Sequence, residues 1–356
     1  MKITKKINMK ASILALLFGG LFLVASCSKS SEDEAAMVNK SALTTLNTST
    51  QTLFDISLEG SADGQYILGS KAELQTVLDV AKALAADTSA TQIQIDNMIV
   101  QLNQAITLFG TKKVTPIDAA NLVGQWTFDE GSGTTVKDYS TTSANGTFGS
   151  SILGTGTAMP TWTTDRYGNA NKAIAFNNGA KITVPYNAKL NPAKMSISLW
   201  INPAEKSDNN RFMGLHSWNG YKFQLQGDNK PFFTGATTAD GVHDRDDAAG
   251  ILELNTWYNI TVTFGDGHNV FYINGTKVQD WDNTPGTLAL VTDHDLTFGV
   301  GSSKYAATTA NYDADKIIPA EWGGFFAGSL DDIRMYKSVL TEAQVKSIYD
   351  AEKKAN

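Results

Sequence analysis

The sequence predicts a mainly β protein, in which a two-sheet antiparallel sandwich follows a small three-helix bundle. Residues 35–109 contain no Trp and no Pro, and their apolar residues recur every three or four positions, as in amphipathic helices. After residue 119, apolar and polar residues alternate in short runs separated by Gly, Asn and Pro, which is the pattern of an all-β sandwich. Residues 122–140 begin this second pattern and open the main domain.

The N-terminal residues 1–26 have the composition of a secretory signal. Four lysines precede an apolar run at residues 13–23, which is too short to span a membrane, and small residues lead up to Cys27. This segment resembles the lipobox of bacterial lipoproteins. The resemblance implies that Cys27, the one cysteine of the chain, carries several acyl chains, which together give stable anchoring. A buried free thiol is the alternative for this residue.

Residues 27–37 read as an acidic tether. Ser28 and the acidic run at residues 32–34 resemble the signal that directs some lipoproteins of Gram-negative bacteria to the exterior face of the outer membrane. A plain solvated tether would have the same composition. Removal of residues 1–26 takes away four lysines and no acid, so the formal net charge changes from −7 to −11. This charge disfavours nucleic acid and anionic lipid surfaces, and membrane contact is expected through the lipid anchor only.

Residues 38–113 predict a bundle of three helices. The helices cover about residues 38–56, 71–86 and 91–109, with Ser70 and Thr91 as N-caps. Several positions in this segment, Tyr66 among them, resemble the small helical modules of FIVAR type found in bacterial surface proteins. A spacer and an independent sugar-binding module both agree with that resemblance. Residues 114–118, which include Pro116, form the linker to the main domain.

Alternating segments predict the strands of the main domain, residues 119–352. The predicted strands are 122–128, 173–176, 181–184, 195–201, 221–226, 258–264, 269–273, 276–278, 296–300 and 329–336. Asn274 and Gly275 form the strongest hairpin turn signal of the chain. The alternation slips by one residue at Asp331 and Asp332, which predicts a β-bulge. A capping box at residues 341–344 predicts a closing helix.

Seven segments together resemble the laminin-G-like, concanavalin A-like lectin/glucanase superfamily. In chain order they are WTFDEGSG (126–133), DYS (138–140), KAIAF (172–176), MSISLWI (195–201), NTWY (255–258), FYING (271–275) and FAGSLDDIRMY (326–336). The resemblance implies a jelly-roll sandwich of two antiparallel sheets over nearly all of residues 119–352. It also implies a structural calcium ion held by Asp138 and Asp331, because carboxylate oxygens suit this cation. Both carboxylates could instead cap turns.

Glycan binding by such a sandwich would use aromatic faces in loops. The candidates are Trp218, Tyr221, Trp281 and Trp322, each of which could also pack within the fold. The segment 240–247 (DGVHDRDD) is rich in aspartate and contains one His and one Arg. Its spacing matches no known metal motif, and a solvated loop is expected.

The function predicted from the sequence is binding of a polysaccharide or other glycan by a lipid-anchored protein at the cell surface. No strand offers Glu-x-Asp-x-Glu, so the paired carboxylates of glycoside hydrolysis are not evident and the protein is expected to be no enzyme. Acids that converge from distant loops would escape this pattern. The main alternative is a structural or adhesive module that binds surface proteins, and a glycoside hydrolase is the less favoured one.

Overall fold

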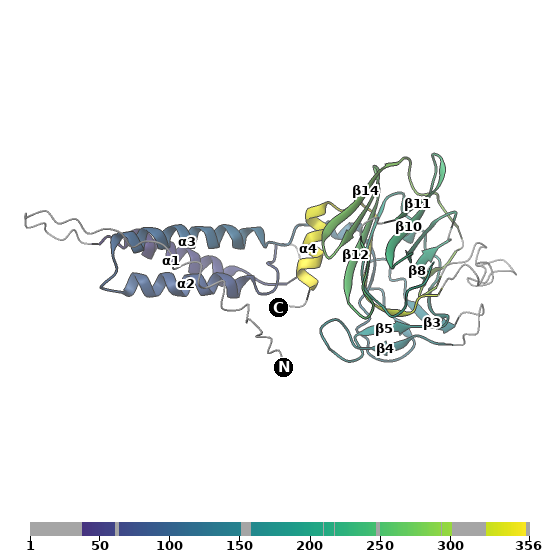
Figure 1. Ribbon diagram of the computed structural model, residues 1–356, viewed down its shortest axis with the longest axis horizontal. Helices are drawn as coiled ribbons and strands as arrows, with labels where there is room; N and C mark the ends of the chain where they lie inside the picture. The colour runs from purple at the N-terminus through teal and green to yellow at the C-terminus, as the bar shows by residue number, and fades with distance from the viewer. Residues whose placement is uncertain are drawn as a thin grey trace, which may run out of the picture.

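The computed structural model shows an elongated helical bundle followed by a β sandwich (Figure 1). It describes residues 38–60, 64–150, 158–208, 210–216, 218–246, 250–292, 294–300 and 325–353. The predicted fold class is confirmed: three helices precede a mainly β part with two antiparallel sheets. Within these residues, no helix combines the length and the apolar character that a membrane span needs.

The bundle consists of α1 (Ser41–Ile56), α2 (Ser70–Ala86) and α3 (Gln92–Thr111). Its core is formed by Leu43, Leu78, Ala81, Ala90, Ile95, Met98 and Leu102. Thr91 caps α3 in a reciprocal capping box with Gln94, as the sequence predicts for the cap. Ser70 is wrong as an N-cap, because Gly69 holds that position with a φ of 89° and the Ser70 hydroxyl donates to the carbonyl of Ile67.

We call the first sheet sheet I. Its strands are β1 (Leu122–Trp126), β4 (Thr161–Thr163), β5 (Ala173–Phe176), β7 (Met195–Pro203), β12 (Tyr258–Gly265), β13 (Gly267–Ile273), β14 (Thr276–Thr284) and β16 (Gly328–Tyr336). Their order is β14-β13-β12-β7-β16-β5-β4, and β1 also pairs with β16. The last strand of the chain therefore lies inside the sheet. The predicted bulge is confirmed between Asp331 and Arg334, where Asp332 has a φ of 45°.

We call the second sheet sheet II. Its strands are β2 (Thr135–Val136), β3 (Gly146–Ser150), β6 (Ala180–Val184), β8 (Asn210–Leu215), β9 (Tyr221–Gln226), β10 (Lys230–Thr237), β11 (Gly241–Asp246) and β15 (Leu296–Phe298). Their order is β11-β10-β9-β8-β15-β6-β3-β2. The expected solvated loop at 240–247 is wrong for residues 241–246, which pair with β10 over the full length of β11. Backbone pairing to a neighbouring strand outweighs the weak strand preference of these acidic residues.

The hydrophobic core lies between the inner faces of the two sheets. Its large members include Trp126, Phe128, Phe212, Tyr221, Phe223, Phe233, Phe264, Phe271, Phe298 and Phe326, all fully buried. Trp126 meets Phe298 edge to face, with ring centroids 5.0 Å apart. Burial of one such side chain contributes about 1.5–3 kcal/mol. Two short 3-10 helices, Ala119–Asn121 and Ala188–Leu190, lie before β1 and β7.

The closing helix α4 (Glu342–Glu352) lies between the bundle and the sandwich (Figure 1). Its predicted capping box between Thr341 and Gln344 is confirmed. On the sandwich side its residues pack in a cluster of Val270, Tyr272, Tyr336, Leu340, Val345 and Ile348. On the bundle side Ala351 packs with Ile67 and Val114. One helix thus contacts both parts of the molecule.

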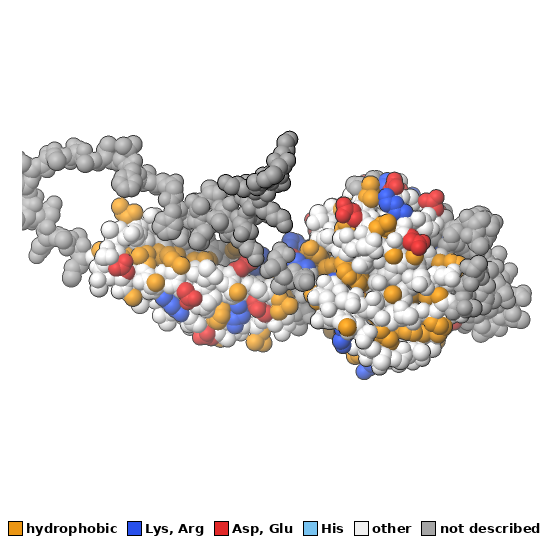
Figure 2. Space-filling model, turned by 60° about the horizontal axis from the view of Figure 1, so that its bottom comes forward, with side chains coloured by type: hydrophobic (Ala, Val, Ile, Leu, Met, Phe, Trp, Pro, Cys, Tyr) orange, Lys and Arg blue, Asp and Glu red, His pale blue; other side chains and the backbone are white. Residues whose placement is uncertain are grey.

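Acidic and basic side chains are interspersed over both parts of the surface. In the view of Figure 2 they form no large basic patch on the described surface that faces the reader. This distribution agrees with the acidic formal net charge of −7. A protein that binds nucleic acid usually gathers its basic residues on one face.

Candidate functional site

A tight turn between β8 and β9 carries Trp218. The turn begins at His216, whose φ of 66° lies in the left-handed region, and the backbone N–H of Gly220 donates to the His216 carbonyl (2.9 Å). The N–H of Asn219 donates to Nδ1 of the same histidine (3.1 Å). A Cβ atom at Gly220 would lie 2.2 Å from the carbonyl oxygen of Leu215, so this turn requires glycine there.

The face of sheet II that points away from sheet I carries a polar cluster. On β9, Lys222 and Gln224 point to this outer face because they alternate with core residues. Thr234 of β10 is the register partner of both Lys222 and Asp244 of β11, so all three share this face. We call the following residues the Trp218 site: Arg211, Trp218, Lys222, Gln224, Phe232, Thr234 and Asp244.

Aromatic rings lie at the rim of the Trp218 site and cations lie beneath them. The ammonium nitrogen of Lys222 is 4.9 Å from the ring centroid of Trp218 and 5.5 Å from that of Phe232. The guanidinium carbon of Arg211 is 5.7 Å from the Trp218 centroid. Both aromatic residues are half-buried, whereas Arg211 is 1% and Lys222 3% exposed. Cations that are withdrawn from water interact strongly with aromatic faces.

A hydrogen-bond chain connects the three strands beneath the rim. The Lys222 ammonium donates to Oγ1 of Thr234 (2.5 Å), and that hydroxyl donates to Oδ1 of Asp244 (2.5 Å). The Lys222–Asp244 ion pair is looser, at 3.7 Å. Burial lowers the pKa of Lys222 to about 8; the Asp244 charge opposes this shift and the Arg211 charge adds to it. Burial likewise lowers the pKa of Arg211 to about 10.

The structure separates the aromatic residues that the sequence proposes for glycan contact. Trp218 lies at the surface of sheet II. Tyr221 is a correction: it is fully buried, and its hydroxyl donates to the carbonyl of Leu190 (2.7 Å), because the β9 alternation points it into the core. Trp322 lies outside the described residues, as does Cys27.

Trp281 lies on β14, in sheet I. Its indole N–H donates to the carbonyl of Asp246 (2.8 Å), and the Arg245 guanidinium carbon is 5.1 Å from its ring centroid. The half-buried ring also packs against the core between the sheets. Trp281 therefore joins the edges of the two sheets, and its described contacts include none of the residues of the Trp218 site.

The residues expected to hold calcium do not fit a shared ion. The Asp138 carboxylate accepts four hydrogen bonds, from the backbone N–H groups of Gln125, Ser140 and Ala144 and from the Ser140 hydroxyl, at 2.8–2.9 Å. Asp331 is paired with an arginine instead. Among the residues that the structure describes, no group of three or more His, Cys, Asp or Glu side chains could hold a metal ion.

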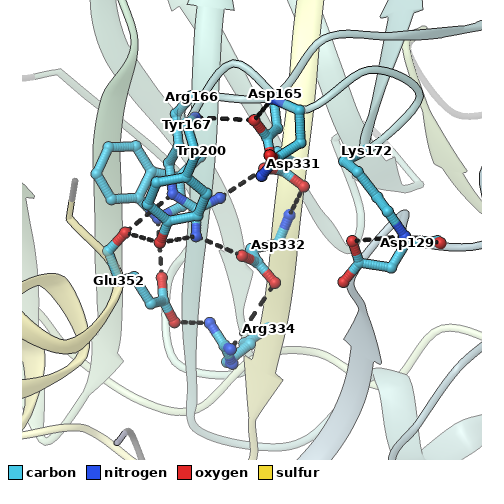
Figure 3. Close-up of polar contacts among 11 residues, drawn as sticks. Asp129, Asp165, Arg166, Tyr167, Lys172, Trp200, Asp331, Asp332, Arg334 and Glu352 are labelled. Carbon is cyan, nitrogen blue, oxygen red and sulfur yellow. Dashed lines mark hydrogen bonds and ion pairs between the residues drawn. The ribbon is translucent and has the colours of Figure 1, made fainter. Parts of the chain in front are cut away.

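The partner of Asp331 is Arg166, in a buried polar cluster beside the central strands β7 and β16 of sheet I (Figure 3). One Arg166 nitrogen is 2.5 Å from Asp331 and another is 2.6 Å from Asp332. The guanidinium lies between the rings of Tyr167 and Trp200, 4.3 and 4.6 Å from their centroids. Burial, and then the Asp332 charge, raises the pKa of Asp331 to about 8, although Arg166 opposes the shift.

The same cluster fastens the end of α4 to the sandwich (Figure 3). The carboxylate of Glu352 accepts from the indole N–H of Trp200 (2.8 Å) and is ion-paired with Arg334. The backbone carbonyl of Glu352 accepts from Nε of Arg166 (3.0 Å) and from the hydroxyl of Tyr167. A cation at the carbonyl end of a helix is stabilising. This cluster therefore holds α4, β7 and β16 together.

Sequence reasoning missed most of the Trp218 site. The alternation of β9 identifies Lys222 and Gln224 as a polar face, but it does not show what lies beside them. Thr234 and Asp244 come from strands that were not predicted. Their position depends on strand register, for which the separate segments carry no signal.

The fold and the site together define a two-sheet β-sandwich protein with an aromatic and polar site on one outer face. Residues 176–346, which cover most of the sandwich, match the family model described as the concanavalin A-like lectin/glucanases superfamily. No protein among the curated sequences matches the chain.

Similar solved structures cover about two thirds of the chain. Domain 4 of AbnA, a GH43 extracellular arabinanase from Geobacillus stearothermophilus in complex with arabinotriose, has 19% identity and a TM-score of 0.46, over 64% of this chain and 98% of that one. The binding domain of Paraclostridial Mosquitocidal Protein 1 has 18% identity and a TM-score of 0.46, over 65% and 52%. The receptor binding domain of botulinum neurotoxin C/D mosaic serotype has 13% identity and a TM-score of 0.44, over 66% and 52%. The chain spans about half the length of the two toxin domains.

Proposed function

We propose that the protein binds a glycan at the Trp218 site. The observation that carries this proposal is the half-buried indole of Trp218 above the chain formed by Lys222, Thr234 and Asp244. A sugar presents an apolar C–H face and polar hydroxyl groups to a protein. An aromatic face covers the first, while hydroxyl, ammonium and carboxylate groups meet the second. The match to a superfamily of lectins and glucanases supports the same function.

The test is binding to a panel of polysaccharides by affinity gel electrophoresis, followed by titration with oligosaccharides. Trp218→Ala should weaken binding at least tenfold, which corresponds to about 1.4 kcal/mol. Trp281→Ala is the matched control, because Trp281 is another half-buried tryptophan that lies outside the site. Retention of no polysaccharide by the wild-type protein, or an equal effect of both variants, would overturn the proposal.

The proposed cellular setting is the exterior of the outer membrane, with lipid attached at Cys27. The support is the sequence of the N-terminal segment, and the bundle α1–α3 would then act as a spacer between the anchor and the sandwich. Metabolic labelling with an alkyne-tagged fatty acid should mark the wild-type protein and leave Cys27→Ala unlabelled. Protease added to intact cells should remove the sandwich. Unlabelled wild-type protein would contradict the anchor, and resistance to protease would contradict the orientation.

We expect binding without cleavage, but one observation favours glycoside hydrolysis as a second candidate. Asp244 and Asp246 stand two residues apart on the same face of β11, with Thr234 and Phe232 as their register partners. Same-face neighbours on a strand are about 6.6 Å apart at Cα, so the two carboxylates can meet one glycosidic bond, and glycoside hydrolysis uses such a pair of acids. Reducing-end release from the bound polysaccharide, lost in Asp244→Asn and Asp246→Asn, would establish this second function.

A further inference from the structure

The ammonium group of Lys222 has donors that the described contacts leave unused. An ammonium carries three N–H donors, and Lys222 gives one of them to Thr234. The nearest carboxylate oxygen, Oδ1 of Asp244, is 3.7 Å away, which is too far for a direct hydrogen bond. The Lys222 side chain is only 3% exposed. A charge withdrawn from water in this way is costly unless an acceptor meets it.

Asp244 is the more exposed partner of Lys222, and its contact with the ammonium group is loose. Its side chain is 50% exposed and its Oδ1 is fixed by the hydroxyl of Thr234 rather than by the ammonium. Asp244 lies on the outer face of sheet II, on the solvent side of Lys222. A second carboxylate that arrives from solvent can therefore take the unused donors of Lys222 if Asp244 turns outward.

We propose that the Trp218 site selects glycans that carry a single carboxylate, such as a uronic or other acidic sugar within an otherwise neutral chain. The sugar ring packs on Trp218 and its carboxylate accepts from the Lys222 ammonium. This proposal rests on the proposed function of the same site. It disfavours densely charged polyanions, because the formal net charge, −7 for the full sequence, repels them as they approach.

The protonation of Lys222 provides a second signature of the same contact. Because burial lowers the pKa of this residue to about 8, part of the protein holds a neutral amine at pH 8. A bound carboxylate favours the charged form. Binding at pH 8 should therefore take up protons, whereas a neutral oligosaccharide of the same shape should not.

The experiment is calorimetric titration with an oligosaccharide that contains one uronate and with the same oligosaccharide after reduction of its carboxyl group. The acidic form should bind at least tenfold more tightly. At pH 8, its apparent binding enthalpy should differ between two buffers of different ionisation enthalpy, because proton uptake is drawn from the buffer. Lys222→Met should reduce the tenfold preference to less than twofold. Asp244→Asn should increase affinity for the acidic form, because it removes a competing carboxylate.

Lys194→Met is the control, since the Lys194 side chain is 43% exposed, is paired with Asp266 outside the site, and its loss should change neither affinity. Circular dichroism and melting temperature establish that each variant is folded. Equal affinity for the acidic and reduced oligosaccharides would overturn this inference and leave the proposed function intact. No binding of either form, or of any polysaccharide in the panel, would overturn both.

Discussion

The indole ring of Trp218 lies over the side chain of Lys222, with the ammonium nitrogen 4.9 Å from the ring centroid. Because Lys222 has lost most of its contact with water, its pKa falls to about 8. Trp218→Ala should readmit water and raise this pKa toward the usual value of about 10.4. The measurement is the pH dependence of acetylation at Lys222, followed by peptide mass spectrometry. Trp281→Ala should leave the midpoint unchanged, and an unchanged midpoint in Trp218→Ala would refute the arrangement.

The buried carboxyl group of Asp331 should make the unfolding free energy depend on pH. Its pKa is about 8 in the folded protein, because of burial and the Asp332 charge, and about 3.9 when unfolded. The folded state thus holds the proton more tightly. This contribution to stability is fully present below about pH 4 and is lost as the pH rises to about 8, by at most about 1.4 kcal/mol per pH unit.

Urea unfolding between pH 5 and pH 8 measures this dependence. Asp331→Asn, which cannot titrate, should show a smaller slope over this window. Asp228→Asn is a suitable control, because the Asp228 side chain is 70% exposed and pairs loosely with Lys206 (3.5 Å). A wild-type slope equal to that of Asp331→Asn would contradict the expected linkage.

Two glycine substitutions should differ in their effect on the free energy of unfolding. Gly220→Ala brings a Cβ atom to 2.2 Å from the carbonyl oxygen of Leu215, and a backbone atom cannot move aside cheaply. We expect a loss of about 2–4 kcal/mol in unfolding free energy. Gly110→Ala in α3 meets no atom within 4 Å and should be neutral or stabilising, by up to about 1 kcal/mol. Thermal unfolding of both variants measures this difference. Equal stability of Gly220→Ala and Gly110→Ala would contradict the turn geometry at Gly220.

The Glu352 carboxylate should be needed to hold α4 against the sandwich. Glu352→Gln removes the negative charge that is paired with Arg334. The Arg334 side chain, which is only 14% exposed, then keeps its positive charge without this carboxylate. We expect a loss of about 2 kcal/mol or more. Hydrogen exchange of α4 amides should quicken in this variant. Glu342→Gln on the same helix is the control, since its 61% exposed side chain should change stability by less than about 0.5 kcal/mol.

A chelator should leave the melting temperature unchanged. The oxygens of Asp138 are taken by backbone and hydroxyl donors of its own turn, and Asp331 pairs with Arg166. A cation that bound the folded protein would raise its melting temperature in proportion to the logarithm of its concentration. Calorimetric scans with EDTA and with added calcium measure this. A rise of several degrees with calcium would restore the metal site implied by the family resemblance.

Local sequence patterns predicted those parts of the fold that local chemistry decides. The alternation of β7, β9 and β12 identified strands, and the N-cap at Thr91 and the capping box at Thr341 identified helix starts. The slip at Asp331 identified the bulge. Each of these signals lies within about ten residues, where period and hydrogen-bonding chemistry are sufficient.

Features that depend on distant pairing were not predictable in the same way. β10 contains a proline and two adjacent phenylalanines, which break the alternation, and β11 is rich in acids. Both are strands because neighbouring backbones pair with them. The Trp218 site could not be predicted for the same reason: Lys222, Thr234 and Asp244 meet only when three strands are in register. Arg166 similarly meets Asp331 across 165 positions of sequence.

The place of β16 inside sheet I determines when this domain can fold. β1 begins at Leu122, but its partner begins at Gly328, and the same late strand separates β5 from β7. Until β16 has been made, β1 lacks its partner strand, and β5 and β7 lack the strand that lies between them. Closure of such distant contacts is slow, because loop entropy must be overcome first. Sheet I is therefore completed only after β16 has been made, although its other strands can pair earlier.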